Sequence, residues 1–213
     1  EVSQKNATGN HYEKRMARPA LYTMNDTLVA FVHKDPISLD FDREPLIPYA
    51  GSNKGPALAV ADINNDGLHD LFLGGAKKQS SALYVQNASG GFSNWQPELF
   101  EAHATNEDVA STFIDVNGDG FKDLLVGSGG NEFKTGLPLQ PRLYLNDNGK
   151  FALDPNQFAK IAANVSKIAP SDFDQDGDID FFMASDQIST QFGKTPKQYF
   201  FENDGTGKFK NVV

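Results

Sequence analysis

Short apolar runs recur along the chain, and turn-forming Asp, Asn and Gly residues separate them. Three stretches align as repeats, namely ALAVADINNDGLHDLFLGG (57–75), STFIDVNGDGFKDLLVGSGG (111–130) and KIAPSDFDQDGDIDFFMAS (167–185). In each stretch an apolar run leads into an acidic loop, and a second apolar run follows the loop. Runs of about four to eight β-prone residues between turn residues are typical of short strands. Each repeat therefore begins with two predicted strands joined by an acidic loop.

An aromatic-rich segment follows each of these stretches and predicts two further strands. The three segments are ALYVQNASGGF (82–92), RLYLNDNGKF (142–151) and QYFFENDGTGKF (198–209). A β-prone run, a turn of Asn, Asp or Gly, and then a Phe is a pattern typical of a β-hairpin. Four strands per repeat, with first loop aspartates 53 and 57 residues apart, match the blades of a β-propeller. The predicted fold class is all-β, as a partial propeller of about three four-stranded blades.

The chain divides into an N-terminal segment and the repeats. We expect residues 1–55 to form an irregular or partial-blade segment, because prolines interrupt its β-prone pieces. Residues 56–213 then form three propeller blades, at about 56–110, 111–166 and 167–213. Three blades cannot close a ring, and an open edge exposes unpaired strands. The chain also does not begin with Met, so we expect it to be a fragment of a longer protein, with assembly of several chains as the alternative.

The acidic loops share the pattern D-x-[DN]-x-D-G-x-x-D, which predicts a calcium site in each. Calcium takes about six to eight hard oxygen ligands, and a loop that curls around the ion directs the side chains at positions 1, 3 and 5 inward. Glycine at position 6 permits a sharp turn, position 7 offers its backbone carbonyl, and the aspartate at position 9 completes the shell. The predicted ligands of three calcium ions are Asp62, Asn64, Asp66, Leu68, Asp70, Asp115, Asn117, Asp119, Phe121, Asp123, Asp172, Asp174, Asp176, Asp178 and Asp180.

These loops differ from EF-hand loops, and an alternative interpretation without an ion is also open. An EF-hand carries a glutamate at position 12 between two helices, whereas position 12 here is Leu73, Val126 or Met183 and the flanks are strand-like. Acidic turns without an ion are the alternative interpretation, but clustered carboxylates repel one another unless a cation is present. The third loop has the most carboxylates, so we expect it to bind calcium most tightly.

Composition excludes several function classes. The formal net charge is −9, whereas nucleic-acid binding requires a basic surface. The chain has no cysteine, which excludes disulfides and thiol chemistry. No apolar stretch approaches the ~20 residues of a transmembrane helix. We also find no nucleophile elbow, phosphate-binding loop or dinucleotide fingerprint in the sequence.

The loops and hairpins together resemble FG-GAP/VCBS repeats, the calcium-loop blades of integrin-α-type propellers, over about residues 56–213. The runs FDREPLIP (41–48), GPALAVADINNDG (55–67) and GSGGNEF (127–133) are also similar to exported bacterial VCBS-repeat proteins of the ASPIC/UnbV type. The resemblance implies a seven-bladed propeller whose calcium ions lie on one rim and rigidify the blades, away from the face that binds partners. This chain departs from the family in having only three full blades.

We therefore expect a secreted, periplasmic or outer-surface module that binds a protein or a carbohydrate and is not an enzyme. The alternative is a propeller-based enzyme acting on polysaccharides or phosphoesters. Such an enzyme would carry acids outside the calcium loops, with Asp186, Glu132 and Asp108 as candidates. A third hypothesis is a domain of a larger export or assembly machine without a ligand of its own.

Overall fold

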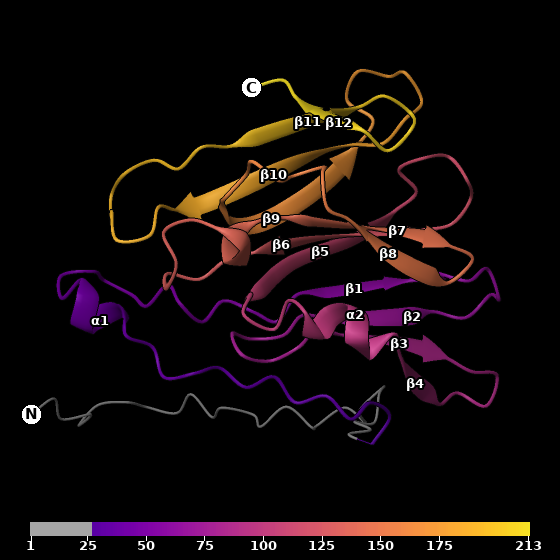
Figure 1. The fold of residues 1–213 in the computed structure, drawn as a ribbon, viewed down its shortest axis with the longest axis horizontal. Helices are drawn as coiled ribbons and strands as arrows, with labels where there is room; N and C mark the ends of the chain where they lie inside the picture. Colours follow the sequence, from indigo (N-terminus) through magenta and orange to yellow (C-terminus); the bar gives the residue numbers. More distant parts are fainter. Residues whose placement is uncertain (1–26) are drawn as a thin grey trace, which may run out of the picture.

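The computed structural model describes residues 27–213 and confirms the predicted all-β class. Three four-stranded antiparallel sheets follow one another along the chain, one for each repeat (Figure 1). No sheet closes on itself, so the arrangement is that of consecutive blades of a partial propeller. Residues 1–26 of the predicted N-terminal segment lie outside the described residues.

Each repeat supplies the four strands of one sheet, and the strands lie in chain order across it. Blade 1 consists of β1 (Leu58–Ala61), β2 (Asp70–Leu73), β3 (Ala82–Gln86) and β4 (Phe92–Trp95). Blade 2 consists of β5 (Asp108–Ile114), β6 (Asp123–Ser128), β7 (Arg142–Asp147) and β8 (Lys150–Asp154). Blade 3 consists of β9 (Asn164–Ser171), β10 (Asp180–Gln187), β11 (Tyr199–Asn203) and β12 (Phe209–Asn211).

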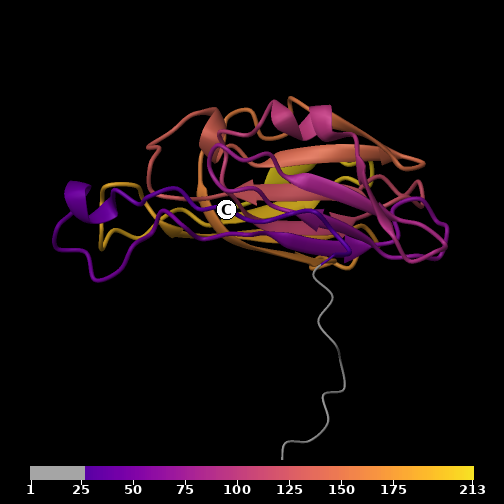
Figure 2. The ribbon, with the colours of Figure 1, turned by 90° about the horizontal axis from the view of Figure 1, so that it is seen from below.

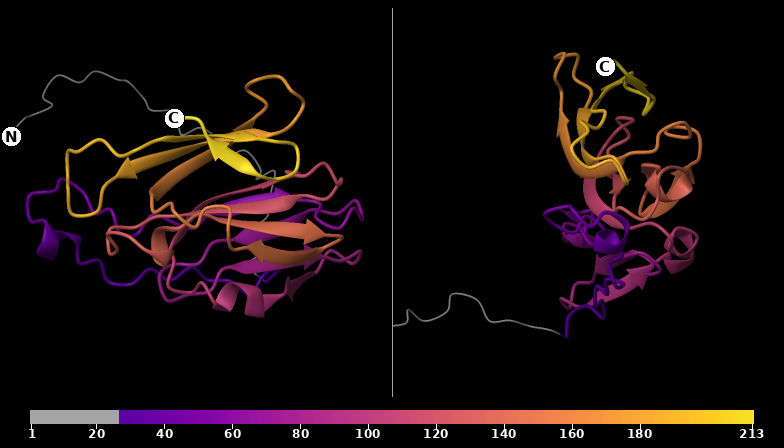
Figure 3. Two further views of the ribbon diagram at one scale, coloured as in Figure 1. Left: turned by 45° about the horizontal axis from the view of Figure 1, so that its top comes forward. Right: turned by 90° about the vertical axis from the view of Figure 1, so that its left-hand side faces the viewer.

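The strand registers give each residue of one blade an equivalent in the others. The equivalent pairs across the second and third strands are Leu71–Tyr84, Leu124–Tyr144 and Phe181–Phe201. The first strands of the blades lie next to one another, because β5 contacts both β1 and β9. Figure 2 shows the resulting stack from below, and Figure 3 shows it from two further directions.

Apolar side chains fill both spaces between the blades. Phe72 and Leu83 of blade 1 share one buried cluster with Tyr144 of blade 2. Leu143 of blade 2 shares a second cluster with Phe181 of blade 3. A blade cannot bury its two faces alone, so much of the stability of this architecture comes from stacking between neighbours.

Blade 3 ends in an open apolar face. The residues that face the next blade from blades 1 and 2 are at most 1% exposed, and they are Ile63, Phe72, Leu83, Val116, Leu125 and Leu143. Their equivalents in blade 3 are Phe173, Phe182 and Phe200, whose rings contact one another. Phe173 is 41% exposed and Phe200 is 38% exposed. This face has the chemistry of an inter-blade contact, and neither of the other two described blades covers it.

Residues 28–56 form a strap across the connections that follow the second strand of each blade. The strap contains the short helix α1 (Asp40–Arg43), and the structure shows no strand between residues 27 and 57. Its contacts reach all three blades: His33 Nδ1 lies 3.2 Å from the carbonyl oxygen of Gly74 in blade 1. Asn131 of blade 2 donates to Asp40, and Gln187 of blade 3 donates to the carbonyl of Gly51. Two other short helices, α2 (Pro97–Glu101) and η1 (Leu137–Leu139), lie in connections of blades 1 and 2.

Candidate metal centres

The three acidic loops join the first strand of each blade to the second, as the repeat pattern predicted. They connect β1 to β2, β5 to β6 and β9 to β10, and they lie together at the right-hand end of Figure 1. The strap contacts the connections at the opposite ends of the strands. We call the two ends of the molecule the loop end and the strap end.

Two positions in every loop have a left-handed backbone. The position-6 glycines have φ values of 85°, 89° and 101°, which confirms the predicted sharp turn. Position 4 is also left-handed, with φ of 58° at Asn65, 72° at Gly118 and 67° at Gln175. L-residues other than Gly and Asn rarely adopt this conformation. The loop pattern did not reveal the requirement at position 4, because the residue there differs in each repeat.

The aspartates at positions 1 and 5 accept hydrogen bonds from the backbone of their own loop. In the first loop, Asp62 Oδ2 accepts from the N–H of Gly67 at 2.8 Å, and Asp66 Oδ1 accepts from the N–H of Leu68 at 2.8 Å. The second and third loops repeat both bonds. These bonds hold the chain in a curl with the carboxylates on a common side.

In the third loop the carboxylates come close enough to share an ion. One oxygen from each of Asp172, Asp174 and Asp176 lies within 4.8 Å of the other two. The first two loops have an asparagine at the middle position, so an amide oxygen takes the place of one carboxylate. Carboxylate and amide oxygens are both ligands of Ca²⁺.

The aspartates at position 9 are fully buried and tie each loop to the third strand of its blade. Asp123 Oδ2 accepts from the N–H of Val116 at 3.0 Å, and its Oδ1 accepts from the N–H of Asn146 at 2.7 Å. Asp70 and Asp180 make the equivalent pairs of bonds, and all three aspartates are 0% exposed. A carboxylate has about four lone-pair positions, so the two bonds leave positions for an ion.

Burial and crowding raise the pKa of several loop carboxyls. Burial is the main cause of the raised pKa at Asp70 and at Asp123, and repulsion from the other carboxylates of each loop raises both pKa values further. The pKa of Asp123 rises to about 6. In the third loop, loss of hydration and then the Asp176 carboxylate raise the pKa of Asp174 and Asp178. No ion pair joins a loop aspartate to Lys or Arg in the part of the chain that the structure describes. Each loop therefore holds like charges that a bound cation would neutralise.

Two residues that the sequence patterns did not single out connect the loops to neighbouring blades. Asn146 Nδ2 donates to the carbonyl of Ile63 in the first loop at 2.8 Å, and Asn203 Nδ2 donates to the carbonyl of Val116 in the second loop at 2.8 Å. Both asparagines lie near the end of the third strand of their blades, and both are buried. Their signal in the sequence is the Asn that follows LYL and FFE in two repeats, where blade 1 has Gln86. Each of the first two loops is thus part of a joint between blades.

The acids named for the alternative enzyme hypothesis all lie in ion pairs at the strap end. The pairs are Asp108–Arg142, Glu132–Lys77 (2.5 Å) and Asp186–Lys54 (2.6 Å). Asp108 and Arg142 are both buried, and Ser81 and Ser128 also donate to the Asp108 carboxylate. These acids are engaged in holding segments of the chain together.

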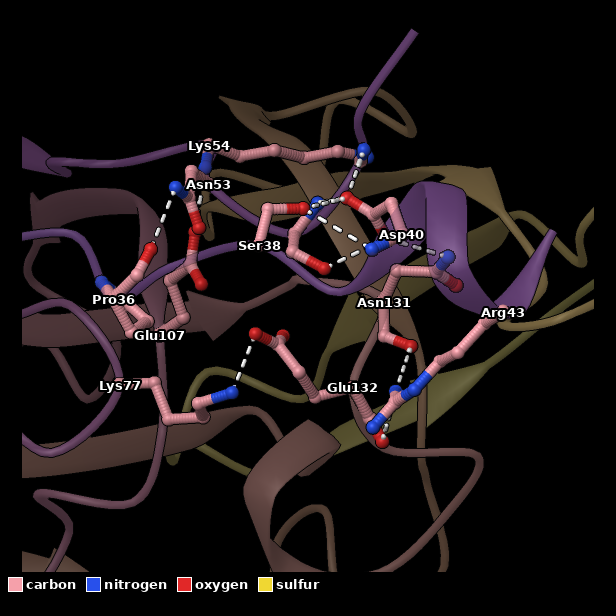
Figure 4. A network of polar contacts seen from close by, with 12 residues as sticks. Pro36, Ser38, Asp40, Arg43, Asn53, Lys54, Lys77, Glu107, Asn131 and Glu132 are labelled. Atoms are coloured by element: carbon pink, nitrogen blue, oxygen red, sulfur yellow. Dashed lines mark hydrogen bonds and ion pairs between the residues drawn. The ribbon is translucent and has the colours of Figure 1, made fainter. Parts of the chain in front are cut away.

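Asp40 anchors the strap in this region (Figure 4). Its carboxylate accepts hydrogen bonds from the N–H groups of Gly51 and Ser52, from the hydroxyls of Ser38 and Ser52, and from Asn131 Nδ2, all at 2.8–2.9 Å. Burial by itself raises the pKa of Asp40, but the hydrogen bonds from Asn131, Ser52 and Ser38 outweigh it and lower the pKa to about 2. The ionised carboxylate is therefore the form that holds the strap.

Glu107 is a buried acid with an incomplete set of partners. Its Oε1 accepts from the N–H of Lys54 at 2.5 Å, whereas its Oε2 has no hydrogen-bond partner among the described residues. Burial, followed by repulsion from the carboxylates of Glu132 and Asp35, raises the pKa of Glu107 to about 7. The sequence patterns did not mark this residue, since it lies outside the repeated loops.

Comparison with known proteins agrees with the geometry of the repeats. The sequence model of the FG-GAP-like repeat matches residues 62–126 and 115–183, which together span more than half of the chain. The chain belongs to the FG-GAP-like repeat family. The match confirms this part of the resemblance found in the sequence, while the likeness to the ASPIC/UnbV type stays a prediction.

Integrin alpha chains share this similarity. Integrin alpha-3 from Mus musculus is 35% identical over 89 residues, which cover 37% of this chain and 8% of the relative. Integrin alpha-2 from Bos taurus is 32% identical over 90 residues, which again cover 37% of this chain and 8% of the relative. The chain therefore matches less than a tenth of the length of these relatives. Between residues 27 and 213, none of the helices is both long and apolar enough to cross a membrane.

Proposed function

We propose that this chain is a calcium-stabilised propeller module that lies outside the cytoplasm and binds a protein partner. The observation that carries the proposal is an acidic loop that recurs at the loop end of three adjacent blades and that no Lys or Arg of residues 27–213 neutralises. Membership of the FG-GAP-like repeat family and similarity to integrin alpha chains support a binding role rather than catalysis. The fifteen ligands named from the sequence would hold three calcium ions.

The ions would act by stiffening the joints between blades. A cation in the first loop neutralises its carboxylates and orders the Ile63 carbonyl, to which Asn146 of blade 2 donates. The second loop has the same relation to Asn203 of blade 3. Calcium binding would therefore stabilise the stacking of blades as well as the loops, and a rigid stack presents a fixed surface to a partner.

A thermal melt of chelator-treated protein tests the calcium part of the proposal. Sites of extracellular modules bind calcium at about 10⁻⁴–10⁻³ M, so millimolar calcium should raise the melting temperature clearly. Calcium at about 1 mM is about 1–10 times such a Kd, so each site should contribute about 0.4–1.4 kcal/mol. Magnesium should have a smaller effect, because it prefers six ligands in strict octahedral geometry. An unchanged melting temperature with calcium would refute the proposal.

The variant Asp119→Ala removes the position-5 ligand of the second loop. In calcium it should lose the increment of one site. In chelator it should lose only about 1 kcal/mol, from the exposed hydrogen bonds that Asp119 accepts from the Phe121 N–H and from Asn117 Nδ2. Asp147→Ala is the matched control, because Asp147 is an exposed aspartate in the β7–β8 hairpin. Equal calcium responses of the two variants would contradict a site in this loop.

We also propose that a further blade of the longer protein covers the open face of blade 3. The two inter-blade contacts within the chain bury the residues equivalent to Phe200, so the same chemistry supports the same kind of neighbour. Phe200→Ser should reduce self-association in light scattering and change the free energy of unfolding by no more than about 1 kcal/mol. Leu143→Ser at the equivalent covered position should cost about 3 kcal/mol or more. Similar costs for both variants would mean that blade 3 has no open face in solution.

A secreted, periplasmic or outer-surface location follows from the same reasoning, because weak calcium sites are filled only where calcium is abundant. Fractionation of the source cells with an antibody to the chain would test the location, and recovery from the cytoplasm would overturn it. A carbohydrate remains the alternative partner, which glycan-array binding would distinguish from a protein. No specific observation favours the enzyme hypothesis, since each acid named for it is ion-paired.

A further inference from the structure

Three oxygen atoms converge on one point at the strap end, beside Gly130. A methyl group on Gly130 would lie 3.1 Å from Glu132 Oε2, 3.2 Å from Glu107 Oε2 and 3.3 Å from the carbonyl oxygen of Ser52. The three oxygens belong to the β6–β7 connection, the residue before β5 and the strap. Because residue 130 is a glycine with φ of 91°, no side chain of its own occupies the point.

The region carries more negative than positive charge. The side chain of Glu132 is 6% exposed, and its Oε1 faces the Lys77 ammonium group at 2.5 Å. Glu107 is 3% exposed, and its Oε2 has no partner in the described part of the chain. The ammonium group of Lys54 faces Asp186 instead. The Lys77 ammonium group pairs with Glu132, as Figure 4 shows from close by, and no ion pair joins Glu107 to a cation in the described part of the chain. A buried charge without compensation is costly.

We propose that Glu107, Glu132 and the carbonyl of Ser52 form a further cation site, distinct from the acidic loops, that binds Ca²⁺ and fixes the strap to blade 2. Carboxylate and carbonyl oxygens are the donors that this hard ion prefers, and its flexible coordination tolerates an irregular set completed by water. The unpartnered Oε2 of Glu107 is the observation that points to a ligand. The three donors of the proposed site come from separate segments of the chain, so the bound ion would cross-link the strap to the first strand of blade 2 and to the β6–β7 connection.

The variant Glu107→Gln removes the unpartnered charge with little change of shape. Equilibrium dialysis with calcium alone should find one bound ion fewer in this variant than in the wild type. In chelator, its melting temperature should equal or exceed that of the wild type, because a costly buried charge is gone. In calcium, the wild type should gain more than the variant. A merely structural role of Glu107 would instead lower the melting temperature equally in chelator and in calcium.

Limited proteolysis of the strap supplies a readout that the loops do not share. Calcium should slow trypsin cleavage after Lys34 and Lys54 about tenfold in the wild type, and it should give no such protection to Glu107→Gln. Glu98→Gln is the charge-matched control, because Glu98 is exposed in α2. Glu132→Gln provides a second variant with the same expected loss of one ion and of protection.

The outcomes also separate this site from the loop sites. Asp119→Ala should lose one ion and keep the calcium protection of the strap, whereas Glu107→Gln should lose one ion and that protection. If Glu107→Gln and Glu132→Gln bind as many ions as the wild type and keep the protection, the carboxylate pair holds a proton or a water molecule and the proposal is overturned. That result would not affect the proposal for the loop sites. The loop-site proposal would fail separately, if Asp119→Ala bound as many calcium ions as the wild type.

Discussion

The loop end and the strap end of this molecule both gather acidic side chains, yet they treat the charge in opposite ways. At the loop end, the same acidic loop recurs in each blade, and no Lys or Arg of the described chain pairs with its aspartates. At the strap end, Asp108, Glu132 and Asp186 each face a cation, and Asp40 accepts five hydrogen bonds. The described chain therefore supplies cations or hydrogen-bond donors to these strap-end acids, whereas it supplies no Lys or Arg to the aspartates at the loop end.

This difference indicates which end should change its stability with the concentration of divalent cations. Stability at the loop end should depend on the concentration of divalent cations, because a ligand stabilises the folded state by mass action. Apart from the cation site proposed at Glu107 and Glu132, stability at the strap end should depend little on divalent cations, because the partners of its other acids belong to the same chain. Four substitutions test this division, and they follow from the largest expected effect to the smallest.

Arg142→Ala should be the most damaging of them, since it leaves the buried Asp108 carboxylate without its cation. Loss of one partner of a buried ion pair typically costs about 3–5 kcal/mol. Urea unfolding should show this loss equally in calcium and in chelator. Lys54→Ala breaks the more exposed pair with Asp186 and should cost about 1 kcal/mol or less. Rescue of Arg142→Ala by calcium would break the proposed division between the ends.

Asp40→Asn tests the strap end by its pH dependence. The folded pKa of about 2 lies below the ordinary value of 3.8, so the ionised carboxylate stabilises the fold above pH 4, and this contribution is lost as the pH falls toward 2. The shift corresponds to about 2 kcal/mol. The difference in free energy of unfolding between wild type and variant should therefore be about 2 kcal/mol at pH 7 and vanish near pH 2. A difference that is constant with pH would show that the charge of Asp40 is not what holds the strap.

Asn146→Ala tests whether the loops act across the joints between blades. The variant loses the bonds from Nδ2 to the carbonyls of Ile63 and Lys122, and leaves buried acceptors behind. A cost of about 1–2 kcal/mol is expected from chemical denaturation. Gln86→Ala at the equivalent position of blade 1 should cost less than about 0.5 kcal/mol, because the Gln86 side chain is only partly buried. Equal losses of stability in Asn146→Ala and Gln86→Ala would contradict a stabilising role for the contact between Asn146 and the first loop.

Gln175→Gly should have the smallest effect and the opposite sign. Gln175 has a φ of 67° at position 4 of the third loop, where the second loop has Gly118. Relief of the left-handed strain should stabilise the protein by up to about 1 kcal/mol, partly offset by the greater freedom of glycine in the unfolded chain. The reverse change, Gly118→Gln, should destabilise by a similar amount. A loss of stability in Gln175→Gly would mean that the glutamine side chain makes a compensating contact in solution.

The repeats show how much of the fold was predictable from sequence. The four-strand unit, the all-β class and the place of the acidic loop between the first two strands were all predicted and are confirmed. The turn at position 6 was also predicted, because only glycine suits the left-handed backbone there in three loops out of three. These features are encoded by neighbours in the sequence, and the threefold repetition makes each local signal stronger.

The strap end could not be predicted in the same way. Asp108 and Arg142 are 34 residues apart, and Asp40 and Asn131 are 91 residues apart. None of these residues belongs to the repeated acidic loop, so the loop pattern marks none of their partners. The prediction of an irregular N-terminal segment did not say that it would cross three blades, and the acids proposed for catalysis turned out to be ion-paired.

The sequence by itself determined the unit of this protein, which is four short strands and an acidic loop rich in the carboxylate and amide oxygens that hard cations prefer. Only the tertiary structure decided how the units meet. It buried the position-9 aspartates, brought Asn146 to the first loop, left Phe200 exposed and placed Glu107 beside Glu132. The physical reason is the sequence separation of the interacting residues. Neighbouring residues fix backbone geometry and loop chemistry, whereas burial and charge compensation depend on distant segments that only the folded chain brings together.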